Sequence, residues 1–196
     1  LVNDAISKIA LSLPNATLYV PNDETKNNCK DAGWDFANIY VGSRIKTLVD
    51  GLNYVCATGD KTAIVVEAKE ECIDKDGIVT IPPTISVKLE GVETPEDYKV
   101  IAIKDNVFSG KTEIKAVKIG ENVQEIGASA FQGCTNLTMV ELPSTLTTIG
   151  TGAFDGCISL TDVISNITDN DAISKIALSL PNATLYVPND ETKNNC

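Results

Sequence analysis

Apolar residues recur along the second half of the chain at a spacing of 23 residues. Three series show this spacing: Ile103, Ile126 and Ile149; Phe108, Phe131 and Phe154; Val117, Val140 and Val163. The valine series continues at Leu185 after 22 residues. A repeat this short cannot bury its own apolar face, so neighbouring repeats stack and share one core. The pattern therefore predicts a solenoid.

Each repeat combines a strand pattern with a turn pattern. In residues 138–143, alternation places Val140 and Leu142 inward and the residues between them outward. Pro143 ends the strand because it has no N–H for a continuing ladder. Residues 150–157 predict a short helical turn on the other side of the repeat, and residues 172–178 predict a small amphipathic helix in the last one.

A longer repeat encloses the short one. Residues 3–29 recur letter for letter as residues 170–196, an offset of 167 residues. Identity over 27 residues does not arise by convergence on a fold, which preserves pattern and not letters. It indicates either a tandem array of 167-residue units or an engineered overlap. We favour the array, because repeat proteins commonly grow by duplicating whole units.

The segment IGASAFQGCTNLTMVELPSTLTTIGTGAFDGCISLTDV (residues 126–163) carries a family pattern. It resembles the BspA-like leucine-rich-repeat family, and the resemblance covers residues 100–188. Residues 16–42 resemble the closing segment of that family, and residues 51–85 resemble its β-rich opening segment. The resemblance implies a right-handed solenoid with a concave parallel sheet. It also implies an extracellular or cell-surface protein, exported by anaerobic bacteria or displayed by some protists, that acts as an adhesin or receptor.

The predicted fold is an α/β solenoid of right-handed leucine-rich repeats with short parallel strands and short helical turns, preceded by an opening β-hairpin segment. Val79 and Ile81 match the inward pair Val140 and Leu142. The expected organisation is a closing repeat and cap of a preceding unit, a connector, a β-rich opening segment with an insertion at 86–99, and repeats with a truncated closing segment: residues 1–41, 42–50, 51–99 and 100–196.

Composition removes several classes of function. The net charge is -11, and no run of Lys and Arg offers the basic stripe that nucleic acid needs. No apolar stretch is long enough to span a bilayer. Histidine is absent, so the commonest general base and the commonest zinc ligand are missing. We predict no catalytic residues, no metal and no cofactor.

Cysteines and one acidic turn are the remaining candidates for chemistry. Cys134 and Cys157 occupy equivalent repeat positions, and we expect a buried, reduced row rather than a disulfide. The residues do not decide the disulfide state of Cys56 and Cys72. The stretch from Asp74 to Gly77 has a calcium-like start but no terminal Glu, so a turn between strands is favoured.

Outward strand positions form the candidate binding surface. One row comprises Ala116, Met139, Asp162 and Thr184, and the other comprises Lys118, Glu141, Ile164 and Tyr186. Solenoid faces of this kind commonly bind partners, and three of these side chains are larger and more apolar than a solvated face needs. We expect a binding module for a protein or glycan of a host or neighbouring cell. The alternative is an inert spacer.

The duplicated segment suggests self-association. Residues 1–29 contain aliphatics that are identical to those of the C-terminal copy, but no repeat precedes them in the sequence. Leaving these side chains exposed would be costly. We therefore expect this segment to pack on the open end of another molecule, head to tail.

Overall fold

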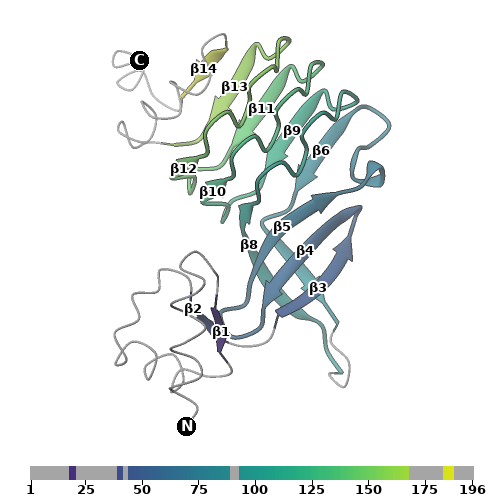
Figure 1. Cartoon of the computed structure of the whole chain (residues 1–196), viewed down its shortest axis with the longest axis vertical. Coiled ribbons are helices and arrows are strands. Elements are labelled where there is room, and N and C mark those ends of the chain that lie inside the picture. The colour runs from purple at the N-terminus through teal and green to yellow at the C-terminus, as the bar shows by residue number, and fades with distance from the viewer. Residues whose placement is uncertain (1–17, 21–38, 42–43, 89–92, 168–182, 188–196) are drawn as a thin grey trace, which may run out of the picture. The chain divides into compact units, whose positions relative to one another are not determined.

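The structure is a computed structural model that describes residues 18–20, 39–41, 44–88, 93–167 and 183–187 (Figure 1). The chain divides into two units, one of residues 1–45 with 56–62 and one of residues 46–55 with 63–196. In the first unit, strands β1 (Leu18–Val20) and β2 (Ile39–Val41) pair in parallel, with Tyr19 opposite Tyr40. The predicted repeats lie in the second unit.

Five parallel strands form the main sheet of the second unit, in the order β14-β13-β11-β9-β6. Their bounds are Ile78–Ile81 for β6, Ala116–Ile119 for β9, Met139–Leu142 for β11, Asp162–Ser165 for β13 and Thr184–Tyr186 for β14. The valine series of the sequence lies in register across this sheet and continues into Val79 at one edge and Leu185 at the other. The predicted parallel strands are confirmed.

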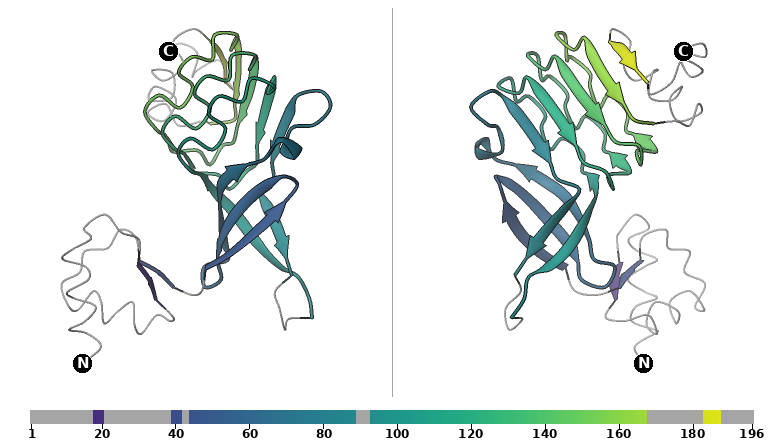
Figure 2. Two further views of the ribbon diagram at one scale, coloured as in Figure 1. Left: turned by 45° about the vertical axis from the view of Figure 1, so that its right-hand side comes forward. Right: turned by 180° about the vertical axis from the view of Figure 1, so that it is seen from behind.

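A second, shorter parallel ladder was not expected from the sequence. The end of β8 (Glu96–Ile103) pairs with β10 (Glu125–Ile126), which pairs with β12 (Thr148–Ile149). Ile103, Ile126 and Ile149 are in register, so the isoleucine series marked this ladder. The chain thus passes from β9 to β10, β11, β12 and β13, alternating between two sheets (Figure 2).

The region before the repeats is rich in strands. Its strands are β3 (Arg44–Val49), β4 (Leu52–Ala57), β5 (Thr62–Ala68) and β7 (Thr84–Val87), and it also holds a 3-10 helix, Glu70–Cys72. Strands β3, β4 and β5 extend the sheet that contains β8, and β7 pairs with β8 in antiparallel fashion. Strand β3 lies inside residues 42–50, where we expected a connector. Its exposure alternates along the strand, as for a strand with one covered face.

The expected short helical turns are successive hydrogen-bonded turns instead. Within residues 150–157, Asp155 N–H donates to Gly152 O and Cys157 N–H donates to Phe154 O. The reason lies in the neighbouring repeat. Phe131 N–H donates to Ala153 O at 2.8 Å, and Gly133 N–H donates to Asp155 O at 2.7 Å. Alternate carbonyls of residues 150–157 therefore accept N–H groups of the preceding repeat instead of those of an α-helical i→i−4 ladder.

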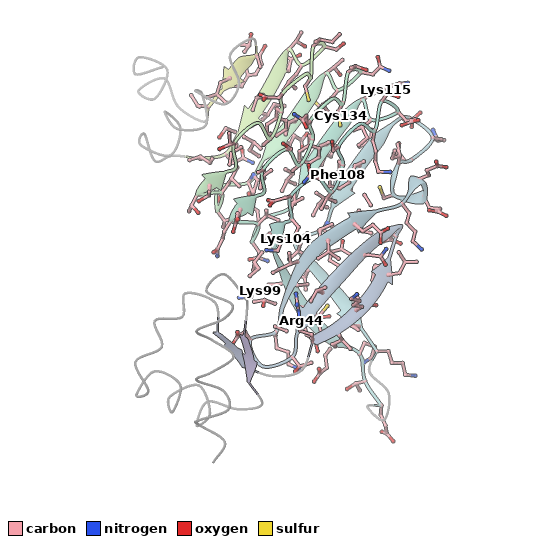
Figure 3. The ribbon with its side chains drawn as sticks, viewed as in Figure 1. Arg44, Lys99, Lys104, Phe108, Lys115 and Cys134 are labelled. Carbon is pink, nitrogen blue, oxygen red and sulfur yellow. The ribbon has the colours of Figure 1, made fainter. Side chains whose placement is uncertain are left out.

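Stacked rings fill the inside of the repeats. The rings of Phe108 and Phe131 have centroids 4.9 Å apart and lie 2° from parallel, and those of Phe131 and Phe154 are 5.2 Å apart and 5° from parallel. Phe108 and Phe131 are completely buried. Figure 3 shows Phe108 and Cys134 on the repeats. Parallel in-register stacking therefore brings the equivalent apolar residues of successive repeats into contact.

Glycine permits the close approach of neighbouring repeats. A Cβ at Gly150 would lie 2.4 Å from the backbone nitrogen of Ala128, well inside van der Waals contact. Gly127 sits one repeat earlier, and its Cβ would lie 2.5 Å from the backbone nitrogen of Asp105. The absence of a side chain at this repeat position therefore sets the spacing between repeats.

The two repeat cysteines differ in burial. Cys134 is fully buried and Cys157 is half-buried, so the expectation of a buried row holds for one of them; both are free thiols. Cys134 Sγ donates to Phe108 O at 3.2 Å, and Cys157 Sγ donates to Phe131 O at 3.1 Å. The neighbouring Cys157 thiol and burial raise the pKa of Cys134, and hydrogen bonding with Cys134 lowers the pKa of Cys157.

Several expected features lie outside the described residues. These are the predicted helix at 172–178, most of the segment 1–29 and most of the closing segments.

Two further cysteines lie before the repeats. Cys56 and Cys72 are free thiols, and burial raises the pKa of Cys56 to about 11.

Candidate binding face

The outward positions of the main sheet form two continuous rows. The register places Ala116, Met139, Asp162 and Thr184 side by side, as the sequence spacing predicted. It likewise aligns Lys118, Glu141, Ile164 and Tyr186. Side chains alternate between the two faces of a sheet, so both rows lie on the face that points away from the buried valines. The structure thus brings together all seven predicted site residues, Lys118, Met139, Glu141, Asp162, Ile164, Thr184 and Tyr186.

Two further residues extend these rows. Ile78 lies opposite Ala116, and Thr80 lies opposite Lys118. The sequence pattern predicted the inward positions Val79 and Ile81 but not their outward neighbours Ile78 and Thr80. We call the two rows, including Ile78 and Thr80, the outer face.

Side chains on the outer face differ in exposure. Lys118, Thr184 and Tyr186 are exposed, and Met139, Glu141, Asp162 and Ile164 are half-buried. Ala116 is 8% exposed, so it adds little contact surface. Tyr186 is 49% exposed and is one of three large exposed apolar side chains in the described part of the chain. The outer face therefore carries an exposed aromatic ring next to partly exposed Ile164.

Charged groups on the outer face are paired with neighbours. Lys118 Nζ lies 3.9 Å from Glu141 Oε1, a weak surface ion pair. Thr161 Oγ1 donates to Asp162 Oδ2 at 2.8 Å. A hydrogen bond with Asp162 and the negative charge of that carboxylate both raise the pKa of the Tyr186 phenol. The outer face thus mixes one cation, two carboxylates and the four large apolar side chains of Ile78, Met139, Ile164 and Tyr186, with no dominant sign of charge.

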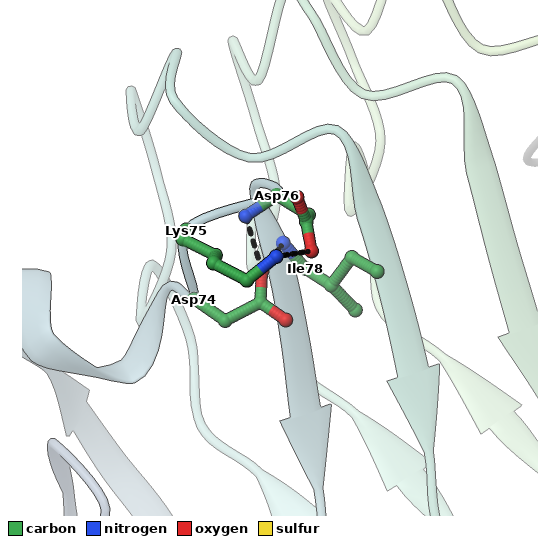
Figure 4. Close-up of polar contacts among 4 residues, drawn as sticks. All are labelled: Asp74, Lys75, Asp76 and Ile78. Atoms are coloured by element: carbon green, nitrogen blue, oxygen red, sulfur yellow. Dashed lines mark hydrogen bonds and ion pairs between the residues drawn. The ribbon is translucent and has the colours of Figure 1, made fainter.

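The acidic turn at Asp74 is structural in its contacts (Figure 4). Asp74 Oδ1 accepts the backbone N–H groups of Asp76 at 2.9 Å and Ile78 at 2.8 Å. These hydrogen bonds, that from Ile78 first, lower the pKa of Asp74. Lys75 Nζ pairs with Asp76 Oδ2 at 2.8 Å. The carboxylates are thus engaged in shaping the turn that leads into β6, the role that the sequence favoured over a calcium loop.

Other chemistry is sparse in the part of the chain that the structure describes. No group of three or more Cys, Asp or Glu side chains is gathered there as a set of metal ligands. Nor does any helix in that part have the length and apolarity needed to cross a membrane.

Comparison with known proteins identifies the repeats. The family model of the BspA type leucine rich repeat region matches residues 86–183 with six copies. The chain belongs to this family. The match begins at residue 86, so it includes residues 86–99, where we expected an insertion before the repeats. No curated protein matches the chain in a sequence search.

Solved structures of bacterial leucine-rich repeat proteins resemble the chain. A leucine rich cell surface protein from Faecalibacterium prausnitzii is 25% identical, with a TM-score of 0.50, over 63% of this chain and 33% of that one. A leucine-rich repeat protein from Bacteroides ovatus is 27% identical, with a TM-score of 0.51, over 60% and 29%. One from Bacteroides capillosus is 21% identical, with a TM-score of 0.56, over 74% and 99%, and shows the fold alone. The chain spans about a third of the first two proteins.

Proposed function

We propose that this chain is a non-catalytic binding module of a secreted or cell-surface bacterial protein. It adheres to a protein or glycan of a host or neighbouring cell through the outer face. The observation that carries the proposal is the in-register row that ends in Ile164 and Tyr186.

Packing does not account for the apolar residues in these rows. The inward positions of the same strands hold Val117, Val140 and Val163 in one row and Ile119, Leu142 and Ser165 in the other, and all six side chains are buried. The outward positions hold Met139, Ile164 and Tyr186, of which Tyr186 is about half exposed. Exposed aromatic and aliphatic groups with a polar surround are typical of residues that anchor interfaces.

The comparisons support the location in this proposal. The similar protein from Faecalibacterium prausnitzii is described as a cell surface protein. We infer the same location for this chain, together with a right-handed solenoid in which the outer face is the concave side and a β-hairpin segment opens the domain. A concave sheet would surround a ligand on more than one side and bury more of its surface.

The second candidate function is a spacer in a surface stalk. The repetition of residues 3–29 as residues 170–196 favours it, because identical units suit a role in which length matters more than sequence. In a spacer the outer face would bind nothing, and its substitution would have no effect on adhesion.

Ile164 and Ile158 offer a matched test. Both are isoleucines of one repeat; Ile164 lies on the outer face, and Ile158 lies in the turn, 83% exposed. The full chain is tested against immobilised extracellular-matrix proteins and a mammalian glycan array. We expect Ile164→Ala and Tyr186→Ala to weaken binding roughly tenfold or more, as loss of interface anchors does. Ile158→Ala is expected to leave binding unchanged.

The same experiment separates the two candidate functions. No binding to any probe, or equal losses from Ile164→Ala and Ile158→Ala, would support the spacer and contradict the binding face.

A further inference from the structure

Two thiols occupy equivalent positions in successive repeats. Cys134 and Cys157 are 23 residues apart, and both are free. Each ends the same hydrogen-bonded turn. Cys134 N–H donates to Phe131 O at 3.2 Å, and the equivalent bond runs from Cys157 N–H to Phe154 O at 3.1 Å. Both turns lie within residues 93–167, which the structure describes without a gap, so the pair is formed by the stacking of two described repeats.

The side chains of the pair are oriented alike. Cys134 Sγ lies 3.2 Å from Phe108 O. Cys157 Sγ lies 3.1 Å from Phe131 O, so each thiol leans toward the preceding repeat. The Cys157 thiol is the largest influence that raises the pKa of Cys134, and the Cys134 thiol is the largest influence that lowers the pKa of Cys157. The two sulfur atoms are therefore neighbours across the repeat junction.

The stack sets the separation of the two thiols. The rings of Phe131 and Phe154 have centroids 5.2 Å apart. A Cβ on Gly156, the residue before Cys157, would lie 3.5 Å from the Cα of Gly133 in the preceding repeat. Because a bond from Cα adds about 1.5 Å, the two Cα atoms at this position are no more than about 5 Å apart.

This separation favours an ion between the sulfur atoms over a disulfide. A disulfide draws the two Cβ atoms to about 3.5–4.5 Å and the sulfur atoms to about 2.05 Å, closer than in-register repeats hold equivalent atoms. A bond from thiolate to metal is about 2.3 Å long, so two such bonds in line span about 4.6 Å. An ion held in line by two thiolates therefore fits the spacing that the stack imposes.

The number of ligands selects the kind of ion. Within the part of the chain that the structure describes, no third Cys, Asp or Glu is gathered with this pair as a set of metal ligands. Zinc takes four ligands in structural sites, so two thiols do not satisfy it. Thiolate is a soft ligand that selects Cu(I), and a monovalent d10 ion is satisfied by two ligands in line.

Two charged groups act on the pair. Lys111 precedes Cys134 by 23 residues, so it occupies the equivalent position of the repeat before, and its ammonium group acts on the Cys134 thiol. The carboxylate of Asp155 acts on Cys157 with the opposite sign. Two thiolates around one monovalent ion carry a single net negative charge, which Lys111 stabilises and Asp155 opposes.

We propose that Cys134 and Cys157 form a two-coordinate site for a soft monovalent cation, Cu(I), between successive repeats. The ion enters at half-buried Cys157 and is shared with buried Cys134. Two S–Cu bonds form and each thiol releases its proton to solvent; the ion binds as Cu(I), so no electron is transferred. The bound ion links the two turns and stabilises the folded chain by mass action.

The site is independent of the outer face and of any ligand there. Its members are 23 residues apart, so no short motif contains both, and for this reason we expected no metal from the sequence.

Transfer of Cu(I) from a coloured chelator tests the site. The full chain carries Cys29→Ser and Cys196→Ser, so that cysteines outside the described residues do not bind the ion. Cu(I) is supplied without oxygen as its bicinchoninate complex. We expect this parent chain to take up one Cu(I), measured as loss of colour, and its thermal unfolding midpoint to rise. X-ray absorption of the copper should show two sulfur neighbours in line.

Cys157→Ser and Cys72→Ser are matched variants, because both cysteines are half-buried free thiols and only Cys157 belongs to the pair. Cys157→Ser removes a ligand, so it should weaken binding by more than the roughly 10–100-fold that loss of a supporting residue costs a metal site. It should also abolish the rise in the midpoint. Cys72→Ser should bind as the parent chain does, and Lys111→Met should weaken binding roughly tenfold.

Cys134→Ser should lose the ion as Cys157→Ser does, and circular dichroism verifies that each variant is folded. If the buried substitution prevents folding, Cys157→Ser alone decides the test. No transfer of Cu(I) to the parent chain, equal losses from Cys157→Ser and Cys72→Ser, or three or more ligands in the absorption spectrum would overturn the proposal.

Discussion

The two faces of the main sheet follow the same register but different rules of composition. Inward, one row repeats Val117, Val140 and Val163 without change, and the other holds Ile119, Leu142 and Ser165; all are buried. Outward, on the same strands, the positions next to them change from Lys118 to Glu141 to Ile164. The backbone geometry is common to both faces, so it is not the source of the difference.

The difference shows what stacking constrains. An inward side chain touches its equivalents in the repeats before and after it, so its volume and shape must fit at every step. Most outward side chains are at least partly exposed and make surface contacts such as the Lys118–Glu141 pair, so a change there disturbs less packing. Sequence regularity therefore identifies the core, and sequence irregularity identifies the surface on which a partner could be selected.

Removal of a ring from the inner stack should have the largest effect. Phe131 has a stacked ring on each side, whereas Phe154 is 6% exposed and stacks on Phe131 alone among the described rings. We expect Phe131→Ala to lower the free energy of unfolding by roughly 3–5 kcal/mol, and Phe154→Ala by less. Urea denaturation of both variants measures this. An unchanged midpoint for Phe131→Ala would contradict the inner stack.

A methyl group at the repeat junction should have the next largest effect. Gly150→Ala places a Cβ 2.4 Å from the backbone of the neighbouring repeat, which cannot rotate away, and we expect a loss of roughly 3 kcal/mol. Gly110→Ala is the control. Its φ of 74° strains any residue with a Cβ by about 1–2 kcal/mol, but no atom lies within 4 Å. Thermal unfolding should rank the two variants in this order, and the reverse ranking would mean that the junction relaxes.

The two repeat cysteines should differ in reactivity. Burial protects Cys134 and its pKa is raised, whereas Cys157 is half-buried and its pKa is lowered. Because the thiolate is the reactive form, Cys157 should be alkylated at a lower pH than an ordinary thiol. Cys134 should react only when the domain unfolds. Peptide mapping after iodoacetamide treatment of the native chain tests this, and equal labelling of both would be evidence against the inward placement of Cys134.

Loss of the outward ion pair should have the smallest effect. Lys118 and Glu141 are 3.9 Å apart with 48% and 37% of their side chains exposed. We expect Glu141→Gln to change the free energy of unfolding by less than about 1 kcal/mol. A double-mutant cycle with Lys118→Met measures the pair directly. A larger coupling free energy would show that the outer face, like the inner one, contributes to the stability of the fold.

The sequence by itself determined the repeat and its inner face. The 23-residue spacing of Ile, Phe and Val fixed which residues are equivalent, and strand alternation fixed which of them point inward. Both are local consequences of backbone periodicity, so the register of Val140 with Val163 and of Ile164 with Tyr186 could be read in advance. The candidate binding rows were predicted in the same way, because they are the outward positions that alternate with the buried ones along each strand.

Only the tertiary structure decided how the turns and the flanking regions are bonded. Residues 150–157 have a sequence suited to a helical turn, but their carbonyls accept N–H groups from the preceding repeat, a competition that no single repeat reveals. The same holds for β3 in the expected connector and for the short ladder of Ile103, Ile126 and Ile149. Each depends on a partner strand elsewhere in the chain, and a pattern read along one segment does not contain its partner.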